Sequence, residues 1–439
     1  MRFVSTRSKD ISAGFSEAIL KGLAPDGGLF HPAVQPDLAG VFANLKGGIS
    51  FSEAAAATAA ALLDDEMGAG AAARIVERAF DFSPRLRELR EGLYLLELFH
   101  GPTCAFKDFG ASFLAAAMEE VLAAEERSAT VLVATSGDTG SAVARAFHGC
   151  NHIRVVILYP SGRVSPLQEK QLTTLGGNVT ALEIQGSFDE CQHLVKQAFV
   201  DEELRSRLSL TSANSINLGR LLPQAFYYVF AWSALPAGAR KKLYFCVPSG
   251  NFGNLTAGVY AWQWGLPVAG FIAATNRNDV VPRYLESGRF TPGPSLETIS
   301  NAMDVGNPSN FERLQAVFGK DPAAMRAMIR GGRASDEQTR DEIARVYAEH
   351  GLLIDPHTAV GLCVERRLRP QLASSAGSPA PTVIVLATAH PGKFEEIVSR
   401  AAGAPVELPA VLRALRTKRK AAVLLDGSYA ALRNFLLSF

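Results

Sequence analysis

Lys107 stands among apolar neighbours in the stretch 99–110, which reads FHGPTCAFKDFG and precedes a predicted amphipathic helix. Most lysines are solvated surface charges, and a surface position is the ordinary interpretation of this one too. An ammonium group that loses its solvation, however, has a lowered pKa and can act as a nucleophilic amine. If the fold buries Lys107, this residue is therefore suited to bonding covalently with a carbonyl compound.

A second candidate is the glycine-rich segment 250–254, between a predicted strand at 243–247 and a helix beginning near Leu255. Backbone N–H groups at the start of a helix bind anions, and glycine lets the backbone approach its ligand closely. The alternative is a tight turn that uses glycine only for its positive φ. The residues available here to hold a phosphate are Gly250, Asn251, Phe252, Gly253 and Asn254.

The segment 135–140 (TSGDTG) follows a predicted strand and offers hydroxyl groups together with backbone donors at the start of a helix. Such a site suits a substrate carboxylate. The candidate contacts are Thr135, Ser136, Asp138 and Thr139. The alternative is a helix cap with Ser136 or Asp138 as the N-cap, and by itself the segment favours that simpler interpretation.

The segment 214–220 (NSINLGR) brings together amides, a hydroxyl group and one arginine. Arginine with flanking neutral donors is suited to binding phosphate. The candidate contacts are Ser215, Asn217 and Arg220. The alternative is a polar loop that carries an ordinary surface arginine.

Alternating strands and helices must position these residues. Short continuous apolar runs, typical of strands buried on both faces, occur at 131–135, 155–159, 243–247 and 383–387. Helices are predicted over 53–67, 111–125 and 141–147. This alternation predicts parallel sheets with helices on both faces and ligands beyond the carboxyl ends of the strands. The glycine and hydroxyl segments follow strands at those ends.

The composition excludes some classes of function. The chain has 439 residues, enough for two or three domains, and a formal net charge of +1. This charge gives no electrostatic case for binding nucleic acid or an anionic membrane, and no run approaches the ~20 apolar residues of a membrane span. Five scattered cysteines and an N-terminus without a signal-peptide pattern favour the cytoplasm. The composition of 373–381 predicts a linker.

Two further chemistries are disfavoured. His148 and His152 have a spacing that can bind zinc on a helix, but Gly149 and Asn151 predict a loop there, so no metal site is expected. Cys104 lies near Lys107, but the sequence shows no histidine paired with it. A small packed thiol is therefore the favoured interpretation of Cys104.

Taken together, these segments resemble threonine synthases of the longer bacterial and fungal form, which are pyridoxal-phosphate (PLP) enzymes related to tryptophan synthase β. The resemblance runs through segments 22–30, 96–110, 135–140, 165–170, 212–220, 248–254, 272–276, 300–305 and 388–394. It implies an α/β chain of PLP fold type II, with two three-layer, parallel-sheet domains and an N-terminal extension. The implied divisions are an N-terminal segment (1–95), a first α/β domain (96–225) and a larger α/β domain (226–439).

By this resemblance Lys107 is the catalytic residue, which binds PLP and, once freed, takes the Cα proton of the substrate. The segment 250–254 would hold the cofactor phosphate, 135–140 the substrate carboxylate and 214–220 the substrate phosphate. Thr388 would bond the pyridine nitrogen, although a β-branched residue at a strand end needs no such role. Asp138 departs from the asparagine common in this superfamily. An ionised carboxylate cannot donate to the ring oxygen of the cofactor as an amide can.

The implied activity is the last step of threonine biosynthesis. In it a carbon–oxygen lyase converts O-phospho-L-homoserine and water into L-threonine and phosphate. One alternative is a PLP-dependent serine or threonine dehydratase, whose substrate carries no phosphate for Arg220 to bind. Another is a catalytically inactive homologue that acts as a binding protein, which Lys107 and the glycine loop together disfavour. The chain is expected to be a monomer or a homodimer.

Overall fold

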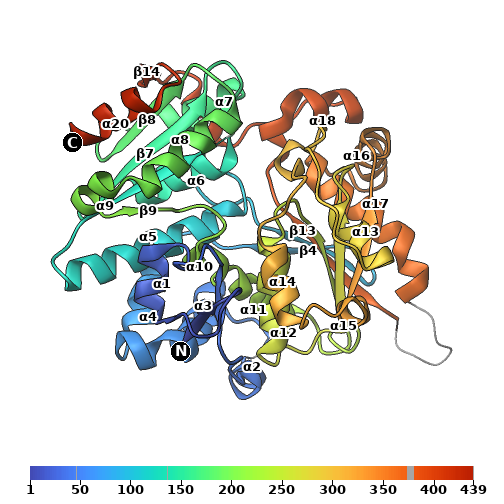
Figure 1. Ribbon diagram of the computed structural model, residues 1–439. Coiled ribbons are helices and arrows are strands. Elements are labelled where there is room, and N and C mark those ends of the chain that lie inside the picture. The colour runs from blue at the N-terminus through green and yellow to red at the C-terminus, as the bar shows by residue number, and fades with distance from the viewer. Residues whose placement is uncertain (46, 136, 373–379, 439) are drawn as a thin grey trace.

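The apolar runs predicted as buried strands form two sheets in the computed structural model, which describes residues 1–45, 47–135, 137–372 and 380–438 (Figure 1). Each sheet lies inside one α/β lobe, and neighbouring strands are parallel with one exception. The predicted fold class is therefore confirmed. Most of the predicted linker, residues 373–379, lies outside the described residues.

The larger sheet has the strand order β12-β11-β10-β13-β5-β4. Its strands are β4 (Arg85–Arg90), β5 (Leu93–Glu97), β10 (Leu243–Pro248), β11 (Gly270–Thr275), β12 (Ile329–Arg333) and β13 (Thr382–Ala387). Only β4, at the edge, runs antiparallel to its neighbour. In β13, Val383 and Val385 pack in one apolar cluster, while Ile384 and Leu386 pack in another. Because both faces of the strand are buried, its sequence is apolar at every position from Val383 to Ala387.

The smaller sheet has the order β14-β8-β7-β6-β9, with all its strands parallel. They are β6 (Ala129–Ala134), β7 (Ile153–Pro160), β8 (Val179–Ile184), β9 (Leu210–Thr211) and β14 (Val423–Leu425). The chain returns to this lobe at its C-terminus, where helix α20 (Tyr429–Leu437) lies beside α8 (Phe188–Val200) (Figure 1). Leu432 and Leu436 of α20 join the apolar cluster on this sheet.

These pairings redraw the three predicted divisions of the chain. Strands β4 and β5 fall almost wholly within the predicted N-terminal segment 1–95, yet they complete the larger sheet. Strand β14 falls within the predicted second domain, yet it completes the smaller sheet. Each lobe is thus built from parts of the chain that are far apart in the sequence.

The first eighty residues pack against helices of both lobes. They form a short antiparallel sheet from β1 (Phe3–Ser5), β2 (Ser12–Ala13) and β3 (Phe30–Pro32). Their helices are α1 (Phe15–Lys21), α2 (Ala39–Asn44), α3 (Phe51–Met67) and α4 (Ala71–Ala79). Helix α3 confirms the helix predicted over 53–67, and a capping box between Ser50 and Glu53 fixes its start.

Other helices cover the sheets. Those before residue 224 are α5 (Lys107–Ala124), α6 (Asp138–Phe147), α7 (Pro166–Thr173), α9 (Glu202–Leu208) and α10 (Leu218–Leu221). Those that follow are α11 (Gln224–Ala234), α12 (Gly253–Gln263), α13 (Val280–Ser287), η1 (Asn301–Met303), α14 (Phe311–Val317), α15 (Pro322–Met328), α16 (Asp336–His350), α17 (Pro356–Leu372), η2 (Pro391–Phe394), α18 (Glu395–Ala402) and α19 (Ala410–Leu415). Within the described parts of the chain, none of the helices is long and apolar enough to cross a membrane.

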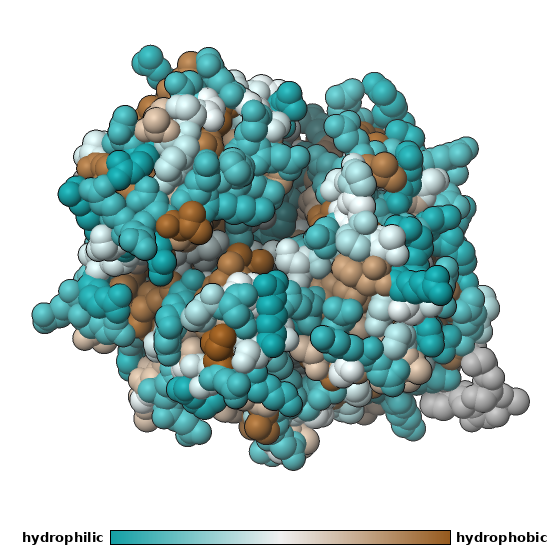
Figure 2. All heavy atoms as spheres, in the orientation of Figure 1, coloured by the Kyte–Doolittle hydropathy of each residue, from teal (hydrophilic) through white to brown (hydrophobic). Residues whose placement is uncertain are grey.

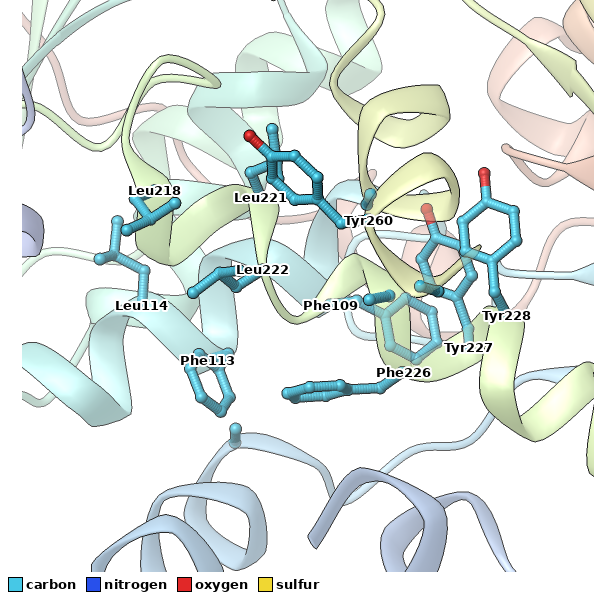
Figure 3. Packing of buried hydrophobic residues seen from close by; sticks show 14 of the residues in the cluster. Phe109, Phe113, Leu114, Leu218, Leu221, Leu222, Phe226, Tyr227, Tyr228 and Tyr260 are labelled. Atoms are coloured by element: carbon cyan, nitrogen blue, oxygen red, sulfur yellow. The ribbon is translucent and has the colours of Figure 1, made fainter. Parts of the chain in front are cut away.

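Helix α5 is held firmly because its apolar side chains are buried among those of other helices. Figure 3 shows Phe109 and Phe113 of α5 close to aromatic residues of α11. The Phe109 ring lies 5.6 Å from that of Tyr227, and the Phe113 ring 5.5 Å from that of Phe226, both edge to face. The first residue of this anchored helix is Lys107.

Candidate active site

Lys107 lies beside Thr388, although the two are far apart in the sequence. The Phe106 N–H donates to the Thr388 carbonyl at 2.8 Å, and Ala105 forms an antiparallel bridge with Ala389. These contacts place the start of α5 against the carboxyl end of β13, where the sequence predicts ligand binding. The structure therefore brings together two of the predicted cofactor contacts.

The Lys107 amine is half-buried and, among the described residues, has neither a hydrogen-bond partner nor an ion pair. Burial lowers the pKa of this amine, because a charged ammonium group loses solvation there. Asp138 opposes the lowering, whereas the positive charges of Lys393 and Arg220 add to it. Lys107 thus has the environment that favours a neutral, nucleophilic amine.

The segment 250–254 forms an open cradle at the start of α12. No partner is found in the described parts of the chain for any backbone N–H of residues 250–254. Phe252 has φ of 61°, a left-handed conformation that turns the backbone into the helix. A Cβ atom on Gly250 would lie 2.7 Å from Cα of Met303, so only glycine fits there. This arrangement fits a phosphate group.

Two asparagines of the cradle have structural partners. Asn254 accepts from the Leu255 N–H at 3.0 Å and donates to the Pro248 carbonyl at 2.9 Å, so its amide fixes the turn. Asn251 donates to the Ser215 hydroxyl at 2.6 Å. The cradle therefore touches the segment predicted to bind the substrate phosphate.

A buried histidine supports the cradle from behind. Nε2 of His357 accepts from the Ala302 N–H at 3.2 Å, and its Nδ1 lies 2.6 Å from Asp355. The side chains of His357 and Asp355 are 4% and 0% exposed. Because Ala302 and Met303 lie against Gly250, His357 holds the wall of the cradle in place. His357 belongs to none of the sequence motifs described above.

The segment 135–140 has a different internal structure from the predicted cap. Gly137 is the N-cap of α6, and Asp138 is the first helical residue. The Thr135 hydroxyl accepts from the N–H groups of Gly137 at 3.0 Å and Gly140 at 2.9 Å. Thr139 is half-buried at the start of α6, and Ser136 lies outside the described residues. The cap with Asp138 as N-cap is therefore wrong.

Asp138 is committed to a buried ion pair. Its Oδ1 lies 2.7 Å from Nζ of Lys393 and accepts from Nε2 of Gln168 at 2.9 Å. Burial acts to raise the pKa of Asp138, but Lys393 and Lys107 together hold it well below its usual range. Asp138 is an ionised acceptor, as its residue type implies.

Arg220 is buried near Lys107 without a carboxylate partner. Its Nη1 donates to the Ala213 carbonyl at 2.6 Å, while its Nε is buried and has no partner in the described chain. Burial lowers the pKa of this guanidinium to about 10, with Asp108 acting in the opposite direction. An anionic ligand would satisfy both the buried charge of Arg220 and its unpaired Nε–H donor.

Asn217 and Arg313 shape the loop that carries Arg220. The Asn217 amide donates to the carbonyls of Ile19 and Ser212, each at 2.8 Å, and accepts from the Gly219 N–H at 2.9 Å. These bonds use both amide hydrogens. The fully buried Arg313 donates to the Phe30 and Ile216 carbonyls and to Asn310. No local pattern distinguishes Arg313, because a helical arginine is usually exposed.

Cys104 and the pair His148 and His152 lie in ordinary structural settings. Burial raises the pKa of the Cys104 thiol to about 12, so this thiol is a poor nucleophile at neutral pH. Within residues 1–45, 47–135, 137–372 and 380–438, no group of three or more metal-binding side chains occurs. His152 instead lies 3.0 Å from Glu119.

Comparison with known protein families covers nearly the whole chain. The family described as "Threonine synthase N terminus" matches residues 2–80, "Pyridoxal-phosphate dependent enzyme" matches 79–388, and "Threonine synthase, C-terminal" matches 358–436. Threonine synthase of Haemophilus influenzae is 43% identical over 437 residues, covering all of both chains. The chain belongs to the threonine synthase family. PLP is the cofactor of this family of enzymes.

Solved threonine synthase structures share the whole fold. The PLP-bound enzyme from Brucella melitensis is 38% identical, with a TM-score of 0.91 over 99% of this chain and 98% of that one. The Escherichia coli enzyme is 41% identical, with a TM-score of 0.89 over the full length of both. The threonine synthase fold therefore includes the N-terminal segment and the C-terminal return to the smaller lobe.

Proposed function

We propose that this enzyme converts O-phospho-L-homoserine and water into L-threonine and phosphate. When bound, PLP draws electrons from the carbon atoms next to the substrate amine, which eases the loss of their protons. Lys107 takes the proton from Cα and then from Cβ. The Cγ–O bond breaks and phosphate leaves. Water then supplies a hydroxyl group to Cβ and a proton to Cγ. Lys107 returns a proton to Cα, and the proton taken from Cβ leaves with the phosphate, which balances the reaction.

The residues of the cradle and of strand β13 would hold the cofactor. The unpaired N–H groups of 250–254 support binding of its phosphate, with Gly250 and Gly253 leaving room for close approach. Thr388, at the end of β13, supplies a neutral hydroxyl group for the pyridine nitrogen. The substrate carboxylate would bind through the Thr139 hydroxyl and the N–H groups of Asp138 and Thr139, which have no partner among the described residues. The hydroxyl of Thr135 is already used within the loop.

The observation that carries the choice of a phosphorylated substrate is the orphaned, buried guanidinium of Arg220. A cation in this state requires an anion, and Asp138 is already bound by Lys393. Ser215 adds a hydroxyl group close to the cradle through Asn251. We propose that Arg220 and Ser215 bind the leaving phosphate, and that Asn217 shapes their loop.

The test is phosphate release from O-phospho-L-homoserine by the purified holoenzyme, with threonine measured in parallel. We expect equal amounts of the two products, and none from Lys107→Ala, which also lacks the absorbance of lysine-bound cofactor. Keto acid formed from serine or threonine without phosphate release would instead identify a dehydratase. A protein that binds no PLP would be an inactive homologue.

Arg220→Ala tests the second anion site. Loss of a hydrogen bond to a charged group costs ~1.5–3 kcal/mol, so we expect KM for the phosphorylated substrate to rise ~10–150-fold with PLP retained. Arg240→Ala is the matched control, because Arg240 also donates to backbone carbonyls but lies in the turn that follows α11. Loss of PLP with an unchanged KM would show that Arg220 belongs to the cofactor site.

Two broader features are also proposals. Five free cysteines, four of them buried, support a reducing cytoplasm. A monomer or homodimer is proposed, and sedimentation equilibrium of the holoenzyme distinguishes the two.

A further inference from the structure

The charges of two lysines, Lys107 and Lys393, act on the carboxylate of Asp138. Lys393 lies in η2, just after β13 of the larger sheet, and its side chain is fully buried. Its ammonium group is 2.7 Å from Asp138 and donates to the Thr103 carbonyl at 3.0 Å. Asp138 begins α6 of the smaller lobe, so this ion pair joins the two lobes. The surface drawn in Figure 2 is hollowed between these lobes.

The geometry leaves Lys107 without a counter-ion. Oδ1 of Asp138 accepts from both Lys393 and Gln168, which hold the carboxylate in one orientation. A Cβ atom on Gly137 would lie 2.7 Å from Nε2 of Gln168, so the glycine allows this close contact. Lys107, on the neighbouring helix, makes no ion pair among the residues that the structure describes.

The other charges around Lys107 do not replace the carboxylate. Arg220 is a second cation and disfavours the ammonium form of Lys107. Asp108, the next residue in the chain, accepts from the N–H of Thr103 at 2.9 Å and from its hydroxyl group. Burial raises the pKa of Asp108 to about 6. Asp138 is therefore the acid on which the charge of Lys107 depends.

We propose that Lys393 is a positioning residue that binds Asp138, so that Asp138 cannot pair with Lys107 and the Lys107 amine stays neutral and nucleophilic. The inference rests on the proposed role of Lys107 as the cofactor lysine. Asp138 and Lys393 then form an ion pair whose two opposite charges offset each other at Lys107. Removing the charge of Lys393 should therefore favour the ammonium form of Lys107, and removing the charge of Asp138 should favour its neutral form. Removing both charges should leave Lys107 nearly unchanged.

The test measures the rate at which the full-length apoenzyme takes up PLP between pH 6 and 10, followed by the absorbance of the lysine-bound cofactor. Only the neutral amine reacts, so the midpoint of the pH profile reports the charge of Lys107. Lys393→Met releases Asp138 and should raise the midpoint by ~1 pH unit. At pH values below the midpoint, PLP uptake should then be about tenfold slower, because a smaller fraction of the amine is neutral. Asp138→Asn should lower the midpoint. The double variant should return toward the wild-type midpoint, and Lys393→Arg should stay close to it.

Lys420→Met is the matched control, since Lys420 pairs with Glu169 and Glu183 and is not among the charges that act on Lys107. Its midpoint should not move. The inference is overturned if Lys393→Met slows uptake equally at every pH, as loss of a purely structural bond would. If that variant does not fold, Asp138→Asn decides, because an unchanged or raised midpoint also overturns it. Uptake that persists with the same spectrum in Lys107→Ala would instead refute the role of Lys107.

Discussion

Gly250→Ala is expected to weaken PLP binding without unfolding the protein. The added Cβ would lie 2.7 Å from Cα of Met303 and 3.2 Å from the Ala302 carbonyl, and both are backbone atoms that cannot rotate away. His357 holds this backbone through the Ala302 N–H, so the cradle rather than its wall must shift. Overpacking of this kind costs ~1–3 kcal/mol, which corresponds to a ~5–150-fold rise in the Kd for PLP.

The assay is titration of the apoenzyme with PLP, with the thermal unfolding midpoint of the apoenzyme measured alongside. Gly40→Ala is the matched control, because Gly40 lies in helix α2 and its Cβ would meet nothing within 4 Å. That variant should bind PLP normally and be slightly more stable, by up to ~1 kcal/mol. The reasoning is refuted if Gly250→Ala binds PLP within twofold (~0.4 kcal/mol) of the wild type.

Two further predictions concern the buried His357 and the half-buried His31. His357→Leu leaves the Ala302 N–H without its acceptor, at a cost of ~1–3 kcal/mol, and should lower both the unfolding midpoint and the PLP affinity; normal PLP affinity would contradict the support role. Burial, together with Arg313 and Lys9, lowers the pKa of His31 to about 4 from an ordinary 6.5. The unfolded chain therefore binds the proton first, and His31 contributes stability above pH 6.5 that is lost as the pH falls toward 4. His31→Gln should remove up to ~3 kcal/mol of that loss, measured by urea unfolding at pH 7 and 4.5; an unchanged pH dependence would refute it.

The secondary structure was largely predictable because the signals are local. Strands buried on both faces are apolar at every position, and the predicted run 383–387 became β13 (Thr382–Ala387) with one residue added. The helix predicted over 111–125 begins earlier, at Lys107, because the turn before it pairs with Thr388 and Ala389. That pairing is a contact between distant segments, which a local pattern does not contain.

The place of the C-terminal segment in the fold also depends on a contact with a distant part of the chain. Residues 423–425 are three apolar residues with no distinctive flanks, and only their pairing with β8 assigns them to the smaller lobe. Lys393 has a sequence signal similar to that of Lys107, since it follows a buried strand and precedes Phe394. The pairing of Lys393 with Asp138 could not be predicted, because the two residues lie on different lobes.

The sequence by itself determined the chemistry that this protein can perform. Lys107, the glycines of 250–254 and Arg220 are residue types whose reactivity or backbone freedom is intrinsic, and the resemblance of their segments to threonine synthases indicated PLP and a phosphate ester. The tertiary structure decided which of the polar residues are free to act. Asn217 is used by backbone groups, Asp138 is bound by Lys393, and Arg220 is left with an orphaned donor. Solvation and partners, which set the charge and availability of a side chain, exist only once distant segments meet.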